Sequence, residues 1–247
     1  MDDKGGLAAV ILAAGEGTRM KSDLAKVLHR IGGKTMIRRI VESVRQIGPE
    51  RIVLVVGYQA EAVRGEFAGE DIGFALQEKR LGTGHAVMKT RDILEDFSGT
   101  VIILTGDTPL LTPQTLRDFC QFHREKGNAA TVMSTRMDDP AGYGRIVRGD
   151  QDELERIVEH ADASPGELKI DEVNSGIFCV DSDYLFDSLS EIGKDNTQDE
   201  YYLTDIIEVL NRQGMRTGVF LCGNNVEVTG INTRSQLEEA ERLISDG

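Results

Sequence analysis

Short apolar runs alternate along the first 140 residues with longer stretches in which apolar positions recur at helical spacing. A buried parallel strand is a near-continuous apolar run, whereas a helix that covers it needs only one apolar face. This pattern predicts strands at 8–13, 51–56, 73–76, 100–104 and 129–134, and helices at 35–46, 59–66, 84–94 and 112–126. Strands that alternate with helices predict an α/β fold with a Rossmann-like, doubly wound and mostly parallel sheet.

The pattern changes after Pro140. Two strands at 142–147 and 153–159 are predicted to pair around the Gly149-Asp150 turn, and a third strand is predicted at 174–180. Further helices are expected at 184–189, 201–212 and 234–245, with an extended segment at 218–221. Because no low-complexity linker separates the two halves, we expect one domain over residues 1–247, in which the second half adds a smaller β lobe to the same sheet.

The charge balance indicates what kind of partner the chain can bind. Lys and Arg number 28 against 42 Asp and Glu, a net charge of −14. Such a surface repels nucleic acids and anionic membranes. Between Arg19 and Arg45, however, eight residues are basic and only Asp23 and Glu42 are acidic. This island predicts a small, strongly anionic ligand, although a solvated helix face is the simpler interpretation for Arg38, Arg39 and Arg45.

The length of the apolar runs and the spacing of the cysteines indicate the cell compartment. No apolar run approaches the roughly 20 residues that span a bilayer, and the apolar stretch 7–14 follows acidic residues, unlike a signal peptide. Cys120, Cys179 and Cys222 form no CxxC pair and no metal-ligand spacing. We therefore expect reduced thiols in a cytoplasmic protein.

The segment Leu12-Ala13-Ala14-Gly15-Glu16-Gly17-Thr18-Arg19-Met20 carries the strongest chemical signal, because it leaves a buried strand and enters a glycine-rich, then basic, loop. Small residues let backbone N–H groups approach phosphate oxygens, and Arg19 and Lys26 could grip them. A dinucleotide-binding GxGxxG would need glycine in place of Met20, and a Walker A loop would need glycine before Lys21. A plain strand-to-helix turn explains the glycines but not the two cations.

The spaced motif Gly15-x-Gly-Thr-Arg-Met-x-Ser-x-x-x-Lys26 resembles the signature of sugar-1-phosphate nucleotidyltransferases. With His29, Gly82-Thr83-Gly84-His85-Ala86 and Gly142-Tyr143-Gly144-Arg145 added, the chain is similar to the N-acetylglucosamine-1-phosphate uridylyltransferase domains of that family, from about residue 8 to about residue 243. The resemblance implies a glycosyltransferase-A-like fold, with a nucleotide-binding part at about 1–140, a sugar-binding part at about 141–232 and a C-terminal helix at about 233–246.

The resemblance also implies roles for single residues. Asp107 follows a buried strand, where ligands of open α/β sheets bind, and with Asn232 it would hold Mg²⁺. Taken alone, Asn232 would also suit a helix N-cap, as would Thr83. Arg19 and Lys26 would be catalytic, and Gln77 would contact the uracil edge. The residues expected to bind the nucleotide are Leu12, Ala13, Ala14, Gly15, Gly17, Thr18, Gln77, Gly82 and Thr83. Those expected to bind the sugar are Gly144, Glu159, Asn174, Tyr202 and Thr204.

The implied reaction joins UTP and N-acetylglucosamine 1-phosphate into UDP-N-acetylglucosamine and pyrophosphate, by in-line attack on the α-phosphate. Two alternatives are a nucleotidyltransferase that uses glucose 1-phosphate or another hexose phosphate, and a non-catalytic sensor of a nucleotide-sugar. Two positions depart from the family pattern. Ala25 stands where the family usually has proline, and Thr105 stands where some members have an aromatic residue. The chain also has none of the hexapeptide repeats of the family's left-handed β-helix domain, so we expect neither acetyltransferase activity nor the trimer built by that domain.

Overall fold

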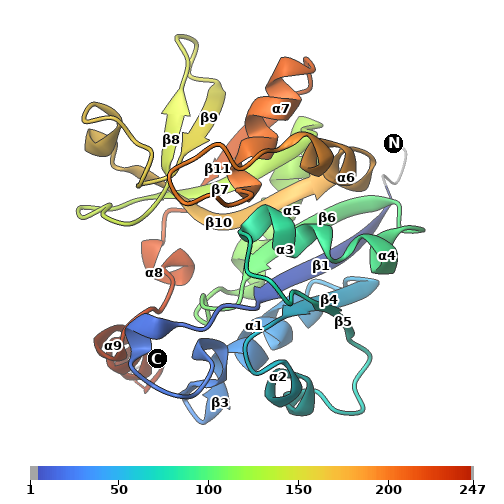
Figure 1. Ribbon diagram of the computed structural model, residues 1–247, viewed down its shortest axis with the longest axis vertical. Helices are drawn as coiled ribbons and strands as arrows, with labels where there is room; N and C mark the ends of the chain where they lie inside the picture. The colour runs from blue at the N-terminus through green and yellow to red at the C-terminus, as the bar shows by residue number, and fades with distance from the viewer. Residues whose placement is uncertain (1–4, 246–247) are drawn as a thin grey trace.

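A computed structural model describes residues 5–245 of the chain (Figure 1). Within these residues a nine-stranded sheet carries the fold. Seven strands follow one another in the order β11-β7-β10-β6-β1-β4-β5, and their bounds are Gly6–Ala13 (β1), Arg51–Val56 (β4), Gly73–Leu76 (β5), Gly99–Thr105 (β6), Ala130–Arg136 (β7), Glu172–Asp181 (β10) and Thr217–Leu221 (β11). The neighbouring strands β1, β4, β5 and β6 are parallel, as is the pair β7 and β11, whereas β10 is antiparallel to both β6 and β7. The predicted mostly parallel α/β sheet is confirmed.

Helices cover both faces of the sheet, as a doubly wound fold requires. Successive residues of a strand point to opposite faces, so Ala8 and Val10 of β1 pack in one core while Ala9 and Ile11 pack in the other. The first core receives α3 (Thr83–Met88), α4 (Arg91–Leu94), α6 (Ser182–Glu191) and α7 (Ile206–Arg212). The second receives α1 (Met36–Arg45), α2 (Ala60–Glu66) and α5 (Pro113–Lys126).

The predicted β lobe is a hairpin of β8 (Arg145–Arg148) and β9 (Leu154–Val158), which joins the sheet through β10. Ile146 lies opposite Ile157 in this hairpin. Figure 1 shows the hairpin beside α7, away from β1, β4 and β5. The expected strand at 142–147 begins only at Arg145, because residues 141–143 form a turn.

Two predicted helices differ from the structure, and three short elements were not predicted. The helix expected at 84–94 is two short helices, because the buried Thr90 hydroxyl donates to the carbonyl of Val87 at 2.7 Å and the chain bends there. The helix expected from 201 is extended at Tyr202 and becomes α-helical only at Ile206. The sequence did not predict α8 (Asn225–Val228). It also did not predict the strands β2 (Arg30–Ile31) and β3 (Lys34–Thr35), which have two residues each and pair as a hairpin.

The last helix, α9 (Arg234–Ser245), lies where it was predicted; its expected end near residue 246 falls outside the described residues. Ala240 of α9 packs with Ile31 and Met36, beside the β2–β3 hairpin. The Arg234 guanidinium donates to the carbonyls of Met20 and Lys21 at 3.1 and 3.0 Å. The far end of the sequence thus holds the first loop, and Figure 1 shows α9 next to the segment that leaves β1.

Two smaller predictions can be compared with the structure. Arg38 forms ion pairs with Glu66 and Glu70, and Arg45 with Glu70, so these members of the basic island belong to a paired helix surface. The three cysteines are free thiols. Among residues 5–245, no helix is both long enough and apolar enough to cross a membrane.

Candidate active site

The carboxyl ends of β1 and β6 meet at the floor of a cleft. Leu12 of β1 is in register with Thr105 of β6, and the Gly106 N–H donates to the Leu12 carbonyl at 2.8 Å. A Cβ atom on Gly106 would lie 2.8 Å from that carbonyl oxygen and 2.9 Å from Cγ1 of Val27. Only glycine fits there, and it delivers Asp107 to the strand end where open α/β sheets bind ligands.

The glycine-rich loop is shaped around Lys26. Gly17 has φ 73°, which L-residues rarely adopt, and a Cβ atom on it would overlap Cβ of Lys26. Gly15 is exposed, and a Cβ atom there would meet nothing within 4 Å. The loop therefore keeps Lys26 against its inner side while Gly15 leaves open space above the cleft.

Four side chains from distant parts of the sequence converge at this point. The Lys26 ammonium lies 2.5 Å from Oδ2 of Asp107 and donates to Oδ1 of Asn232 at 2.9 Å. The Arg19 guanidinium donates to the same Asn232 oxygen at 2.9 Å. The side chains of Lys26 and Asp107 are each 16% exposed, so water screens their interaction only in part. The expected catalytic pair and the expected metal pair thus form one cluster.

The start of α9 orients Asn232. Gln236 accepts through Oε1 from the backbone N–H groups of Asn232 and Thr233 at 2.8 and 3.0 Å, and its own N–H donates to the Thr233 hydroxyl at 3.3 Å. This is a reciprocal capping box. Thr233 therefore caps the helix, and the interpretation of Asn232 as the N-cap is wrong. The Asn232 side chain turns into the cleft, with its NH₂ group donating to the carbonyl of Gly230 at 3.0 Å.

The oxygens of Asp107 and Asn232 fit a hard divalent cation. Mg²⁺ prefers oxygen ligands and binds through one or two protein groups together with waters and substrate phosphates. A Cβ atom on Gly230 would lie 3.0 Å from Oδ2 of Asp107 and 3.3 Å from the Asn232 amide, so glycine keeps this position open. The Lys26 ammonium already bridges both residues and stands in for a cation there. The described residues contain no group of three or more His, Cys, Asp or Glu side chains that could hold a metal.

A cavity of about 250 Å³ adjoins the cluster on the side of β5 and α3. Its lining includes Gln77, whose NH₂ group donates to the Gly82 carbonyl at 3.0 Å and lies 3.0 Å from Nδ1 of His85. Burial lowers the pKa of His85, which favours a neutral ring that can accept this bond. Both amide hydrogens are used, so Oε1 is the atom of the Gln77 side chain that is left to accept a hydrogen bond from a ligand. The other residues predicted for the nucleotide that line this cavity are Leu12, Ala14, Gly15, Gly82 and Thr83.

Thr83 connects this cavity to the second half of the chain. Gly82, with φ 104°, precedes α3 as its N-cap, and a Cβ atom on it would overlap the carbonyl oxygen of Tyr201. Thr83 is the first residue of the helix, and its hydroxyl accepts from the Leu203 N–H at 3.0 Å. The interpretation of Thr83 as an N-cap is therefore wrong, and the residue instead ties α3 to the segment before α7.

A second cavity, of about 200 Å³, continues from the first, with Leu12, Thr83, Thr105 and Asp107 lining both. Glu159 accepts from the Thr204 hydroxyl at 3.2 Å, and burial raises the pKa of this carboxyl. The side-chain oxygen of Asn174 accepts from the Gly176 N–H at 2.8 Å, which leaves the NH₂ group as a donor. Four of the five predicted sugar residues line this cavity: Gly144, Glu159, Asn174 and Thr204.

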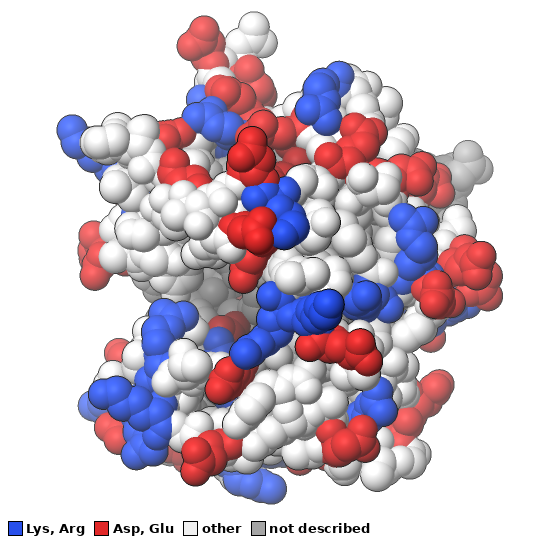
Figure 2. Space-filling view, viewed as in Figure 1, with Lys and Arg blue, Asp and Glu red and all other residues white. Residues whose placement is uncertain are grey.

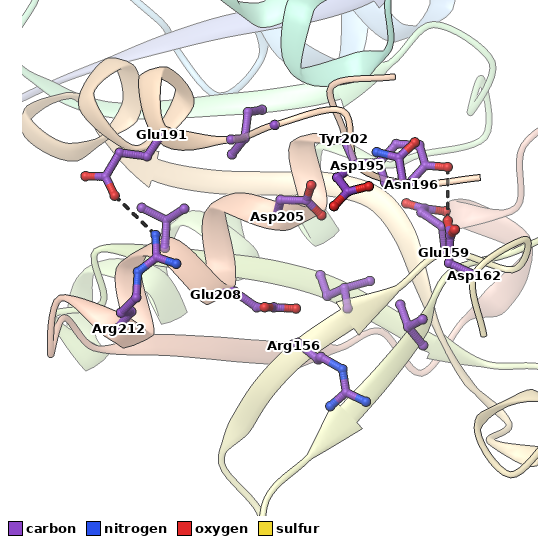
Figure 3. Close-up of a pocket in the computed structure, with 15 residues that line it drawn as sticks. Arg156, Glu159, Asp162, Glu191, Asp195, Asn196, Tyr202, Asp205, Glu208 and Arg212 are labelled. Carbon is purple, nitrogen blue, oxygen red and sulfur yellow. Dashed lines mark hydrogen bonds and ion pairs between the residues drawn. The ribbon is translucent and has the colours of Figure 1, made fainter. Parts of the chain in front are cut away.

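The structure does not bring every predicted residue to these two cavities. Tyr202 lines a third cavity of about 340 Å³, which meets the second only at Glu159 (Figure 3). Its hydroxyl donates to Asp162 at 3.1 Å, as the dashed line in Figure 3 marks. Ala13, the last residue of β1, packs in the second core, and Thr18 is exposed on the loop. Gly17 acts through the position of Lys26 and lines neither of the two cavities.

Sequence reasoning missed several residues around the cleft. Arg80 lines the first cavity and pairs with Glu16 of the glycine loop at 2.8 Å. Tyr143 lines the second, and burial is the main cause of its raised pKa. Tyr143 belongs to the motif Gly142-Tyr143-Gly144-Arg145, which could have indicated it. Nothing in the sequence connects Arg80 with Glu16. Figure 2 shows the surface hollowed between the two halves of the molecule, with Lys and Arg atoms along the border of the hollow.

A cleft at the strand ends of a mostly parallel sheet, with clustered cations beside a hard-oxygen pair, is the arrangement expected of a protein that handles phosphate esters. The sequence matches the Nucleotidyl transferase family over residues 8–225, and the chain belongs to this family.

Individual curated proteins are similar to this chain over nearly its whole length. The chain is 52% identical over 240 residues to "Bifunctional protein GlmU" of Geobacter metallireducens, covering 97% of this chain and 50% of that protein. It is 49% identical over 239 residues to the protein of the same name from Pelobacter propionicus, and 45% identical over 236 residues to that from Oceanobacillus iheyensis, covering 96% of this chain and 52% of each relative. The chain thus spans about half the length of the curated relatives it matches.

A solved structure shares the fold. It is a protein from Bacillus anthracis described as a glucose-1-phosphate thymidylyltransferase, in complex with sucrose. The TM-score is 0.76 at 20% sequence identity, covering 98% of this chain and 96% of that one.

Proposed function

We propose that this chain transfers a uridylyl group from UTP to N-acetylglucosamine 1-phosphate, forming UDP-N-acetylglucosamine and releasing pyrophosphate. One observation carries the proposal: Arg19 and Lys26 meet Asp107 and Asn232 where a cavity suited to a nucleotide joins one suited to a sugar. The similarity to proteins named GlmU and the resemblance of the motifs support the choice of substrates.

The cleft suits attack of the sugar phosphate on the α-phosphorus. A phosphomonoester has a second pKa near 6 and is largely dianionic at pH 7, so the attacking oxygen needs no general base. What the chain must supply is alignment and neutralisation of the charge on the phosphates. Arg19 and Lys26 would hold phosphate oxygens, and the exposed Gly15 would let the triphosphate approach the loop backbone.

Asp107 and Asn232 would hold Mg²⁺ as the cofactor of this reaction. When bound, the metal supplies a positive charge shared between the protein oxygens and the substrate phosphates. Gln77 would accept from the uracil ring through Oε1, while Glu159, Asn174 and Thr204 would contact the hydroxyl and acetamido groups of the sugar. Such substrates and the free thiols of the chain support a cytoplasmic location.

The test is a grid of nucleoside triphosphates against sugar 1-phosphates, with and without Mg²⁺, read by pyrophosphate release. We expect turnover with UTP and N-acetylglucosamine 1-phosphate only when Mg²⁺ is present, and at least tenfold less with glucose 1-phosphate, the scale of discrimination that a well-placed contact provides. Equal or better turnover with glucose 1-phosphate would overturn the assigned sugar. Saturable binding of UDP-N-acetylglucosamine with no turnover would indicate a sensor instead.

A further inference from the structure

Both lone pairs of the Asn232 side-chain oxygen are used in the cluster. A side-chain amide oxygen has two lone pairs, and Oδ1 of Asn232 accepts from both Lys26 and Arg19 at 2.9 Å. The NH₂ group of the same side chain is directed to the Gly230 carbonyl. A metal ion that uses Oδ1 must therefore displace at least one of the two cations.

Of the two cations, Lys26 occupies the position that a metal on Asp107 and Asn232 would take. Its ammonium bridges Asp107 and Asn232 at 2.5 and 2.9 Å, whereas Arg19 contacts only Asn232 in this cluster and is exposed. Mg²⁺ binds oxygens at about 2.0–2.1 Å, so a metal on the same two oxygens would lie almost on top of the ammonium. Two positive charges at that separation repel strongly in a partly shielded site.

We propose that Lys26 is the resident cation of the metal site, and that a divalent metal binds by displacing the Lys26 ammonium from Asp107 and Asn232. This rests on the proposed function, which places the metal on these two residues. Lys26 then has two positions: on the metal ligands before the metal binds, and free to reach the phosphates afterwards.

The displacement couples the metal to the nucleotide. Lys26 also lines the nucleotide cavity, so phosphate oxygens there would give the displaced ammonium new partners. A nucleotide thereby lowers the cost of moving Lys26, and each ligand strengthens the binding of the other by the same factor. The metal alone should bind weakly, which keeps the site from being filled before the substrate arrives.

The test measures Mn²⁺ binding to the whole chain by electron paramagnetic resonance, with neither nucleotide nor sugar phosphate present. Lys26→Met keeps an unbranched side chain as far as Cε and removes the ammonium group, and we expect it to bind Mn²⁺ about fivefold or more tightly than the unmodified protein. Arg80→Gln is the matched control. Arg80 lines the same cavity but pairs with Glu16, so this variant removes a positive charge without changing the contacts of Asp107 and Asn232. We expect less than about a twofold change in the control, since more distant surface charges are screened.

Unchanged or weaker Mn²⁺ binding by Lys26→Met would overturn the proposal, and so would equal tightening by Arg80→Gln, which would make the effect one of general charge. Because no substrate is present, these outcomes do not depend on which nucleotide or sugar the enzyme uses. A failed substrate grid alongside tighter Mn²⁺ binding would refute the proposed function and leave this inference standing.

A second measurement needs no variant. Reductive methylation of the unmodified protein, quantified by mass spectrometry for each lysine, reports how freely the Lys26 amine reacts. We expect Mn²⁺ to raise the modification rate of Lys26 about fivefold or more, while the exposed Lys21 serves as the internal reference. A rate at Lys26 that falls or stays constant with Mn²⁺ would contradict displacement.

Discussion

Arg19 allows the chemistry of the site to be separated from the stability of the fold. Its side chain is exposed and donates to Asn232 within the cluster. We expect Arg19→Ala to lower kcat by about two to three orders of magnitude, the scale of losing a preorganised charge donor, with almost no change in Tm. Steady-state kinetics and thermal melting check this, with Lys21→Ala as the control for an exposed cation in the same loop. Near-normal turnover in Arg19→Ala would exclude the residue from the reaction.

Gly17 and Gly15 form a matched pair of residues with opposite expectations. Gly17→Ala places a methyl group against Lys26 and forces a left-handed conformation, at a cost of about 1–2 kcal/mol in the free energy of unfolding. Gly15→Ala meets nothing within 4 Å, so its free energy of unfolding should be close to that of the unmodified protein. Urea denaturation compares the two. Equal stability would show that the Gly17 conformation is not required.

Asp205 predicts a pH dependence of stability. Its pKa is raised from 3.8 to about 6, first by burial and then by repulsion from Glu208, Glu159 and Asp162. Figure 3 shows the Asp205 and Glu208 carboxylates in the same cavity as Glu159 and Asp162. Asp205 thus binds a proton more tightly in the folded than in the unfolded chain, so its contribution to the free energy of unfolding falls as pH rises from 3.8 to about 6 and is level above that.

Asp205→Asn removes the buried charge and keeps the shape of the side chain. We expect it to be more stable than the unmodified protein at pH 7, by on the order of 1 kcal/mol because Asp205 is only half-buried, and to lose this advantage near pH 4. Denaturation curves at the two pH values test this, with Asp195→Asn as the control for an exposed carboxylate in the same cavity. An equal advantage at both pH values would contradict the assignment.

The candidate site was predictable where chemistry depends on residue type. Asp107 after a buried strand and the cations Arg19 and Lys26 follow from charge and position, and the structure brings them together. The contacts that hold them do not follow, because the Arg234 bonds to the loop and the double use of Asn232 join residues more than 200 positions apart. Tyr202 shows the limit of motif reasoning, since it lines a different cavity.

Among the elements, α9 has a role beyond packing because its capping box orients Asn232. Thr233→Ala removes the cap, and we expect the free energy of unfolding to fall by about 1 kcal/mol. Mg²⁺-dependent turnover should fall more than this loss of stability explains, since Asn232 loses its fixed direction. Urea denaturation and kinetics at varied Mg²⁺ measure both effects. Ser245→Ala, at the other end of the helix, is the control, and equal turnover in the two variants would contradict the role of the cap.

Periodicity predicted the long elements and missed the short ones for a physical reason. Runs such as 51–56 bury every side chain after the first, so their apolar pattern is unbroken. The strands β2 and β3 have only two residues each, which is too few to show a period. The break between α3 and α4 depends on one buried hydroxyl bond at Thr90, which a helical pattern of residues does not reveal.

At the scale of the whole molecule, sheet order explains why two cavities share one cleft. The chain enters the sheet at β1, between β4 and β6, and β10 then runs antiparallel beside β6 and joins the β8–β9 hairpin to the same sheet. The cavity proposed for the nucleotide and the cavity proposed for the sugar therefore share residues at the ends of β1 and β6. The parallel part was predictable from alternating strands and helices, but the direction of β10 depends on tertiary pairing.

The most direct test of the account is a crystal structure with UDP-N-acetylglucosamine and Mg²⁺. We expect the diphosphate between the glycine loop and Asp107, with Mg²⁺ on Asp107 and Asn232 and the Lys26 ammonium moved onto a phosphate oxygen. The uracil should lie at Gln77, and the sugar should lie at Glu159 and Asn174. A nucleotide bound away from the glycine loop, or a metal bound away from Asp107, would contradict the central claim.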